Sequence, residues 1–564
     1  MNINRYLYFI CAAAILVLSG VTASAQKYGY EYPMELQPAS FSGTYGELRG
    51  NHFHAGVDWR TNGRVGQPLH AIKDGYICRL SVSPTGYGNA VYINHGDGTM
   101  SVYGHMNDFR DDIAARIRRE QYAKESYSVD FTLTEDEFPV EQGEVFGHSG
   151  NTGSSGGPHL HMEIRKDDGN LPLNYLADGT YPVDDKTSPT IRRVGFYAYE
   201  DTTSVPLTSR LAMISAPQSY SGVVPVSEKF YVAVDAVDLM DKASFRYAVD
   251  RYTVYFDSKK VFSLRIGDVP YSDGKYYKCL VQEGEKGADL IKSHVVPNNG
   301  FAYKSECTDN GIMTVSDTRQ HTVRIVVADP FGNTTSCELQ VRRSPSAVAE
   351  TAADTTGRAM LWYMPNFYMN EDLTFVLPAA SLMNSAYVAC TKVGEADRAV
   401  GIYSGIWQIG DADIPLVQKG RLRFAEPDSL DCPAEKLFVA GCGSGGSLWY
   451  AGKRNDAGAL EARCGFGTYC VAVDTLAPVL SPRVTDGAAL PDNGRFSVEA
   501  SDDRSGIASY RVEMDGRWIL CQLHRGRIQV YPDASHKTGK MHSVRVSAAD
   551  NCENSSEIEF SVKY

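Results

Sequence analysis

Residues 157–165 read GPHLHMEIR, and the alternation of polar and apolar side chains predicts a half-buried β-strand. Because alternate side chains of a strand share a face, His159, His161 and Glu163 would lie together on one side. The apolar residues between them would face a core. The stretch before the strand, SGNTGSSGGP, resembles a phosphate-binding loop, but such loops lead into a helix N-terminus rather than a strand. We interpret it as a turn that delivers the two histidines.

A second stretch has a similar arrangement. Residues 54–60 read HAGVDWR, and as a strand they would place His54, Asp58 and Arg60 on one face. Gly56 lies between the imidazole and the carboxylate on that face and would leave room for an ion. The apolar residues of the stretch would face a core. An imidazole and a carboxylate would therefore project together.

A third expected strand, TMSVYGHM at residues 99–106, ends with His105, which alternation places on the same face as Tyr103. Two histidines and one aspartate are a sufficient set of protein ligands for a catalytic zinc ion, with the fourth tetrahedral position left to water. Two histidines would remain for proton and charge handling. Each motif alone is more typical of a surface strand with solvated imidazoles, whereas their co-occurrence in one glycine-rich segment favours a metal site.

Histidines are concentrated in this part of the chain, since eight of the 13 fall between His52 and His161. His52 is a candidate for lining the same site. His95 precedes a GDG turn, where a structural role is expected. His70 and His148 occur in loop-like contexts, and we expect them to be exposed to solvent rather than functional.

The stretches NHFHAGVD, YGHM and SGNTGSSGGPHLHMEIR, in that order, resemble the lysostaphin-type (LytM-like) zinc metallopeptidases. The intervening GQPLHAIKDGYI and GYGNAVYINHGDGTMSVYGH are similar to the β-sheet core of that family. The resemblance covers roughly residues 40–175. Met162 stands where an aromatic residue is common, and we expect it to face the core without affecting the metal. The later β-rich part resembles the domains appended to exported homologues from Gram-negative bacteria.

The resemblance implies a role for each of five residues. His54 and Asp58 match the HxxxD zinc ligands, and His161 matches the third ligand. His105 and His159 match the catalytic histidines, of which one takes the proton of the attacking water and the other steadies the oxyanion. The implied activity is that of a zinc metalloendopeptidase that hydrolyses peptide cross-links or stem peptides of peptidoglycan.

Two alternatives stay open at this point. The protein could be a non-catalytic LytM-like activator of another wall hydrolase, although such members typically lose metal ligands and this sequence keeps all of them. It could also be mainly an envelope scaffold or adhesin, with envelope proteins bound through its β-sandwich domains.

Residues 1–25 are expected to be a secretory signal peptide, because Arg5 is followed by an apolar run and by Ala23-Ser24-Ala25. The mature chain would start at Gln26. No later stretch approaches 18 uninterrupted apolar residues, so we expect no transmembrane segment in the mature chain. The sequence predicts export, with the periplasm favoured over the cell surface or the medium.

Charge argues against one class of function, and cysteine content bears on possible disulfides. The formal net charge is −13, and no basic stripe occurs, so nucleic-acid binding is not expected. Of the 12 cysteines, 11 lie in the expected mature chain in irregular spacing. Export permits disulfides, for which Cys464 with Cys470, or Cys521 with Cys552, are candidates.

The sequence predicts a mostly β protein with one clear helix, NDFRDDIAARIRREQYAKE at 107–125. HTVRIVVADPFGNTTS from His321 and HSVRVSAADNCENSSE from His542 echo each other, which indicates two copies of an Ig-like β-sandwich. We therefore expect an antiparallel β-sheet peptidase domain of the LytM type and two or three Ig-like β-sandwich domains after it. The expected units are a signal peptide (1–25), a zinc peptidase domain (26–184), a sandwich (185–345), a linker (346–359), a β-rich domain (360–473) and a second sandwich (474–564).

Overall fold

The computed structural model describes residues 29–564, apart from 37–39, 51, 167, 203–204, 241–244, 283–284, 286–288, 346–354 and 428. The expected signal peptide and most of the expected linker lie outside the described residues. Within the described part, no helix is both long and apolar enough to cross a membrane.

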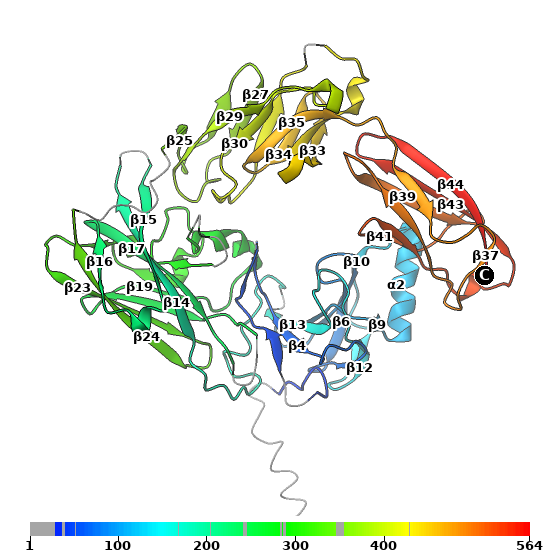
Figure 1. The fold of residues 1–564 in the computed structure, drawn as a ribbon. Helices are drawn as coiled ribbons and strands as arrows, with labels where there is room; N and C mark the ends of the chain where they lie inside the picture. The colour runs from blue at the N-terminus through cyan, green and yellow to red at the C-terminus, as the bar shows by residue number, and fades with distance from the viewer. Residues whose placement is uncertain are drawn as a thin grey trace, which may run out of the picture.

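An antiparallel eight-stranded sheet forms the centre of the N-terminal region (Figure 1). Strand β13, which carries the histidines of the GPHLHMEIR stretch, lies between β4 and β8. A smaller three-stranded sheet packs beside it. The large sheet contains β1 (Phe41–Gly43), β4 (Val57–Arg60), β13 (His159–Lys166), β8 (Thr99–Gly104), β7 (Asn89–Asn94), β6 (Gly75–Val82), β10 (Val129–Thr132) and β11 (Pro139–Val140); the small one contains β5 (Pro68–His70), β12 (Val145–His148) and β9 (Asp108–Phe109).

The expected helix is present as α2 (Asp111–Lys124), which buries Ile113 and Ile117 against the N-terminal core. It begins later than predicted, because residues 108–109 pair with β12 as strand β9. Two acidic residues in its first turn and Lys124 in its last turn stabilise the helix, because their charges oppose those of the helix dipole.

Residues 190–343 form two sheets that share one core. Alternating apolar residues from both sheets fill this core, as the strand periodicity predicted. The first sheet contains β15 (Leu207–Ser215), β14 (Thr190–Glu200), β17 (Lys229–Val237), β20 (Ile291–Lys292) and β22 (Met313–Thr314). The second contains β16 (Val223–Val226), β24 (Thr334–Arg343), β23 (Gln320–Ala328), β18 (Arg251–Phe256), β19 (Lys259–Arg265) and β21 (Ser305–Cys307).

Residues 358–473 form a nine-stranded sheet with a core of its own and a separate pair of short strands. The nine strands are β26 (Asn366–Met369), β27 (Leu373–Leu377), β31 (Gly420–Phe424), β34 (Leu460–Cys464), β33 (Leu448–Arg454), β32 (Leu437–Cys442), β35 (Gly467–Val473), β30 (Ile406–Ile409) and β29 (Cys390–Gly394). The pair consists of β25 (Arg358–Met360) and β28 (Ala386–Val388).

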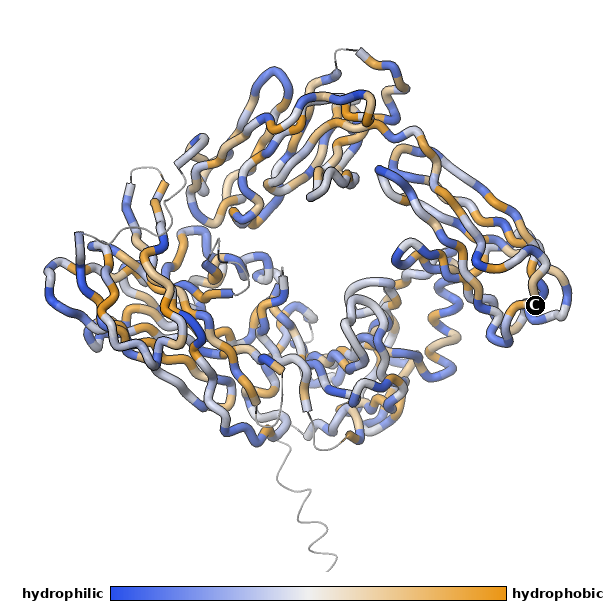
Figure 2. Tube along the Cα trace, in the orientation of Figure 1, coloured by the Kyte–Doolittle hydropathy of each residue, from blue (hydrophilic) through white to orange (hydrophobic). Residues whose placement is uncertain are grey.

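Residues 479–563 again form two sheets around one core. The first contains β36 (Val479–Pro482), β38 (Phe496–Ser501), β42 (Arg527–Val530) and β41 (Cys521–His524). The second contains β37 (Ala488–Ala489), β44 (Ser555–Lys563), β43 (Met541–Asp550), β39 (Ile507–Met514) and β40 (Arg517–Trp518). In Figure 2, hydrophobic residues recur along the strands, whereas many connecting loops are hydrophilic.

The four regions follow one another around a ring, so that the last region returns to helix α2 of the first (Figure 1). At this closure Arg511 pairs with Glu125 at 2.5 Å, and the rings of Tyr122 and Trp518 meet edge to face. The first and second regions share packing, because Phe53 lies in the core of residues 190–343.

The described cysteines are all free, so neither suggested disulfide is formed in this structure. The sulfur atom nearest to Cys470 belongs instead to Cys442, at 3.6 Å. Cysteine spacing along the chain gave no information on which strands would pair.

Candidate active site

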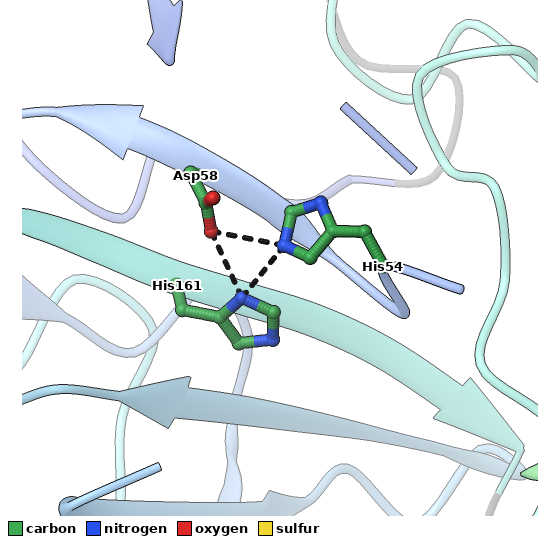
Figure 3. A group of neighbouring side chains, drawn as sticks. All are labelled: His54, Asp58 and His161. Atoms are coloured by element: carbon green, nitrogen blue, oxygen red, sulfur yellow. Dashed lines mark hydrogen bonds and ion pairs between the residues drawn. The ribbon is translucent and has the colours of Figure 1, made fainter. Parts of the chain in front are cut away.

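Strand pairing brings the two histidine-bearing motifs together. In the register of β13 with β4, His161 lies opposite Asp58. His54 reaches the same point from the segment before β4. The Asp58 Oδ1 atom is 3.0 Å from His54 Nε2 and 2.9 Å from His161 Nδ1, and the two nitrogens are 3.0 Å apart (Figure 3). All three side chains are buried.

The route by which His54 reaches this point differs from the prediction. Strand β4 begins only at Val57, and His54 follows the short strand β3 (His52–Phe53). Gly56 makes room for a ligand residue rather than for an ion. A Cβ atom there would lie 2.5 Å from the Met162 carbonyl oxygen and 2.9 Å from His161 Cε1.

Backbone and carboxylate acceptors fix the orientation of both rings. His54 Nδ1 lies 2.8 Å from the Thr44 carbonyl oxygen, which can only accept, so this nitrogen carries the proton. His161 Nε2 donates in the same way to Glu163 Oε1 at 2.8 Å. The second nitrogens, His54 Nε2 and His161 Nδ1, therefore point at each other and at Asp58. Three potential ligand atoms converging on one point fit a zinc ion, whose histidine ligands are held by such outer partners.

The electrostatics of this group favour positive charge at its centre. Burial would raise the pKa of Asp58, but the His54 charge and hydrogen bonds from the surrounding histidines hold it well below its usual range. Burial would lower the pKa of His161, but hydrogen bonds to Asp58 and Glu163 outweigh it and raise this pKa to about 9, so His161 would release its Nδ1 proton on binding a metal. The same negative field would attract a metal cation.

Two further histidines face this group. His105 Nδ1 and His159 Nδ1 each donate to a backbone carbonyl at 2.8 Å, those of Thr152 and Gly157. Nε2 is therefore the ring nitrogen that each of them presents to the site, and the two ring centroids are 4.8 Å apart. His159 Nε2 lies 3.4 Å from Asp58 Oδ1. Burial and the charges of His161 and His159 lower the pKa of His105 to about 3, which keeps its imidazole neutral.

The alternation argument was wrong for His105. Strand β8 ends at Gly104, and Tyr103 points into the core, where its hydroxyl meets the Ile72 amide. His105 adopts a left-handed backbone with φ of 59°, which turns its ring to the opposite side of the sheet from Tyr103. A continued strand would have kept His105 in the core.

Glu163 holds His161 and is held in turn by three donors. Arg165 Nε donates to Glu163 Oε2 at 2.6 Å, and the hydroxyl of Tyr87 donates to Oε1 at 2.5 Å. The third donor is the hydroxyl of Tyr271, at 2.6 Å from Oε2. Although Glu163 is fully buried, the Arg165 charge and the His161 hydrogen bond keep its pKa well below the usual range. The carboxylate is therefore ionised and accepts from His161.

Tyr271 comes from the second region, where it begins the 3₁₀ helix η2 (Tyr271–Cys279). The sequence gave no signal for it, because it lies more than a hundred residues beyond the histidine motifs. Arg49 was also missed, although it lies only five residues before His54. Its Nη2 atom lies 2.7 Å from Asp58 Oδ2, which engages the carboxylate oxygen that faces away from the two histidines.

A cavity of about 660 Å³ opens in front of the site. Its wall on the side of the N-terminal region includes His52, as the sequence suggested, together with His54, His105 and His161. The opposite wall is formed by residues 269–275 of the second region. The cleft therefore lies between two regions of the chain.

The other histidines of the segment lie outside this group. His95 is buried between the Asp74 carbonyl and the Ser101 hydroxyl, in line with the structural role expected for it. His148 bonds Asp108 at 2.5 Å. His70 is half-buried rather than exposed as predicted, because its Nδ1 donates to the Gly143 carbonyl.

The comparisons with known proteins agree with this geometry. Residues 52–123 match the model of peptidase family M23, and residues 357–474 match that of the Zu5-like domain. The chain is 34% identical over 112 residues to the DD-carboxypeptidase/endopeptidase Mpg of Neisseria meningitidis serogroup B. It is 30% identical over 115 residues to the glycyl-glycine endopeptidase ALE-1 of Staphylococcus capitis. These matches cover 20% of this chain and 20% and 24% of the two relatives, about a fifth of their length.

Among solved structures, the catalytic domain of the prophage-encoded M23 protein EnpA from Enterococcus faecalis is 27% identical. It is matched over 24% of this chain and 86% of that chain, with a TM-score of 0.18. The catalytic domain of lysostaphin from Staphylococcus simulans is 26% identical over 23% and 78%, with a TM-score of 0.17. The match to the M23 family model and the identity to Mpg and ALE-1 show that the N-terminal domain fits a LytM-like M23 peptidase.

Proposed function

We propose that this protein is an exported zinc metalloendopeptidase that hydrolyses peptide bonds of peptidoglycan, in cross-links or stem peptides. The observation that carries the proposal is the convergence of three potential ligand atoms, from His54, Asp58 and His161, beside the Nε2 atoms of His105 and His159. The proposed ligands and proton acceptors thus lie together, and His54, His105 and His161 line the cleft.

In the proposed mechanism, His54, Asp58 and His161 hold the metal. When bound, zinc would supply a Lewis acid that polarises the scissile carbonyl and activates the attacking water. One of His105 and His159 accepts the water proton at Nε2 and returns it to the leaving amine. The other, in the form protonated at Nε2, would donate a hydrogen bond to the developing oxyanion. The two rings are anchored in the same way, so both roles are assigned to the pair.

The substrate class is supported by the relatives, whose printed names describe a DD-carboxypeptidase/endopeptidase and a glycyl-glycine endopeptidase. Such a substrate places the protein outside the cytoplasm, and we propose the periplasm. The later β domains are proposed to position the enzyme on the wall or to bind an envelope protein. Complete retention of the five site residues favours catalysis over the activator alternative.

The test uses the mature chain from Gln26, with purified peptidoglycan as substrate. Zinc-loaded protein should release peptide fragments with newly formed termini, identified by mass spectrometry, and chelation should abolish the release until zinc is restored. Fragments that form equally fast in metal-free protein would reject the metal mechanism. An activator would release nothing alone and would only accelerate a second hydrolase.

A further inference from the structure

A second cluster of ligand-type residues lies away from the histidine site. It contains Asp185, Asp238 and Asp329, whose ligand oxygens lie within 4.8 Å of one another. Asp185 belongs to the segment that leaves the N-terminal region, Asp238 directly follows β17, and Asp329 directly follows β23. All three are buried, with exposed fractions of 8%, 0% and 3%.

Asp238 is the unusual member of this cluster. Among the described residues, neither of its carboxylate oxygens meets a hydrogen-bond donor. Asp329, by contrast, accepts from the Phe331 and Asn333 amides at 2.8 and 2.9 Å and from Asn333 Nδ2 at 2.7 Å. A fully buried carboxylate without a partner is strongly unfavourable unless a proton or a cation accompanies it. Burial and the charges of Asp185 and Asp329 raise the pKa of Asp238 to about 7.

The last region contains a comparable cluster of aspartates at its strand ends, which we also call a corner. In it, Asn554 makes the same contacts as Asn333 makes in the first cluster. Asn554 Nδ2 bonds the Asp474 carbonyl at 3.0 Å and Asp550 Oδ2 at 2.7 Å, as Asn333 Nδ2 bonds the Asp185 carbonyl at 3.1 Å. Each corner also starts from an aspartate four residues before a proline.

The two corners differ at the aspartate that follows the β17 or β38 strand. In the last region this residue is Asp502, and its Oδ2 atom accepts from the Gly506 and Arg504 amides at 2.7 and 3.2 Å. Asp474 is likewise bonded by the Ser505 amide at 2.9 Å. Backbone donors thus partly satisfy the carboxylates of the second cluster. Asp238 in the first cluster has no hydrogen bond of normal geometry among the described residues, and the nearby Leu239 amide only partly offsets the rise of its pKa.

We propose that Asp185, Asp238 and Asp329 bind a calcium ion at the junction between the N-terminal region and residues 190–343. Carboxylate oxygens are the ligands of hard divalent cations, and an irregular corner with three carboxylates suits the flexible geometry of Ca²⁺ better than the strict octahedron of Mg²⁺. The ion would neutralise the mutual repulsion of the three charges and satisfy Asp238.

The position of the cluster gives the ion a structural role. Phe331, two residues after Asp329, packs against the N-terminal core, and Asp185 lies on the connecting segment. A bound ion would therefore tie the connecting segment to the two strand ends. This tie would stabilise the docking that places Tyr271 against Glu163. The inference stands independently of the proposed peptidase activity.

The test is a calcium titration of the mature full-length chain, freed of metals and reloaded with one equivalent of zinc. Calorimetry should show calcium uptake, and saturation should raise the melting temperature by about 5 °C. Asp238→Asn should lose this site and this shift. Asp250→Asn removes another buried carboxylate of the same region, one that pairs with Arg265, and should keep both.

Three results would overturn the proposal. Wild-type protein that takes up no calcium, with Asp238→Asn at least as stable, would show that Asp238 is simply protonated. Calcium uptake that Asp238→Asn leaves unchanged would place the ion elsewhere. Tighter binding of magnesium than of calcium would contradict the assignment of the ion.

Discussion

The direction in which each imidazole lone pair points decides the chemistry of the site. The strand alternation predicted from the sequence is correct for β13, where His161 and Glu163 face the site and Leu160 and Met162 face the core. It failed for His105, because a single left-handed residue reverses the side on which a side chain emerges. No sequence pattern around YGHM signals that reversal.

A prediction at this scale concerns Gly56. Gly56→Ala should displace His161, since the new methyl group would lie 2.9 Å from His161 Cε1 and 2.5 Å from the rigid Met162 carbonyl. Zinc affinity should fall by about 10- to 100-fold, as for other changes that reorient a ligand. Competition with a fluorescent zinc chelator measures this. Gly156→Ala is the control, because its Cβ would meet nothing within 4 Å. Equal zinc affinities in the two variants would contradict the role assigned to Gly56.

At the scale of elements, the site depends on the pairing of strand β13 with its neighbours and on a contact from helix η2 of the second region. The pairing of β13 with β4 and β8 joins motifs that lie far apart in sequence, and similarity of motifs to a known family made this predictable. The approach of η2 was not predictable, because Tyr271 sits in an ordinary-looking stretch and reaches Glu163 only through the docking of two regions. Such long-range contacts leave no local periodicity in the sequence.

Tyr271→Phe tests this element. It removes one donor from the buried Glu163 carboxylate, so His161 should be held less firmly and zinc affinity should fall by about 10-fold. Tyr303→Phe is the matched control, because Tyr303 is exposed and bonds only the surface residue Asp273 among the contacts described. Zinc dissociation rates for both variants, with circular dichroism to check folding, provide the measurement. An unchanged zinc dissociation rate for Tyr271→Phe would show that η2 does not help to hold the metal ligands.

At the scale of the whole molecule, strand periodicity predicted a mostly β chain, and the resemblance of the histidine motifs to a known family implied an N-terminal peptidase-like domain. They did not predict the ring, in which residues 474–564 return to helix α2, because each of its contacts joins surfaces that are hundreds of residues apart. The boundary expected at residue 184 also conceals a shared interface, since Phe53 packs in the core of the second region.

Two truncations separate these contributions. A chain of residues 26–345 keeps every site residue and Tyr271, so it should bind zinc and retain basal hydrolysis even if intact wall is processed less well. A chain of residues 26–184 lacks Tyr271 and the second wall of the cleft, so it should bind zinc more weakly. Elemental analysis after dialysis compares the two, with circular dichroism showing that each is folded. Loss of zinc from a folded 26–345 chain would contradict this division of labour.

The most direct test of the central claim compares zinc content and turnover in four variants of the mature chain. His161→Ala and Asp58→Ala each reduce three protein ligands to two, so both should lose metal and activity together. His159→Ala and His105→Ala should keep about one zinc and lose about two to four powers of ten in rate. Each variant is first shown to be folded by circular dichroism. If His159→Ala loses its metal while His161→Ala keeps it, the assignment of ligands and catalysts is wrong.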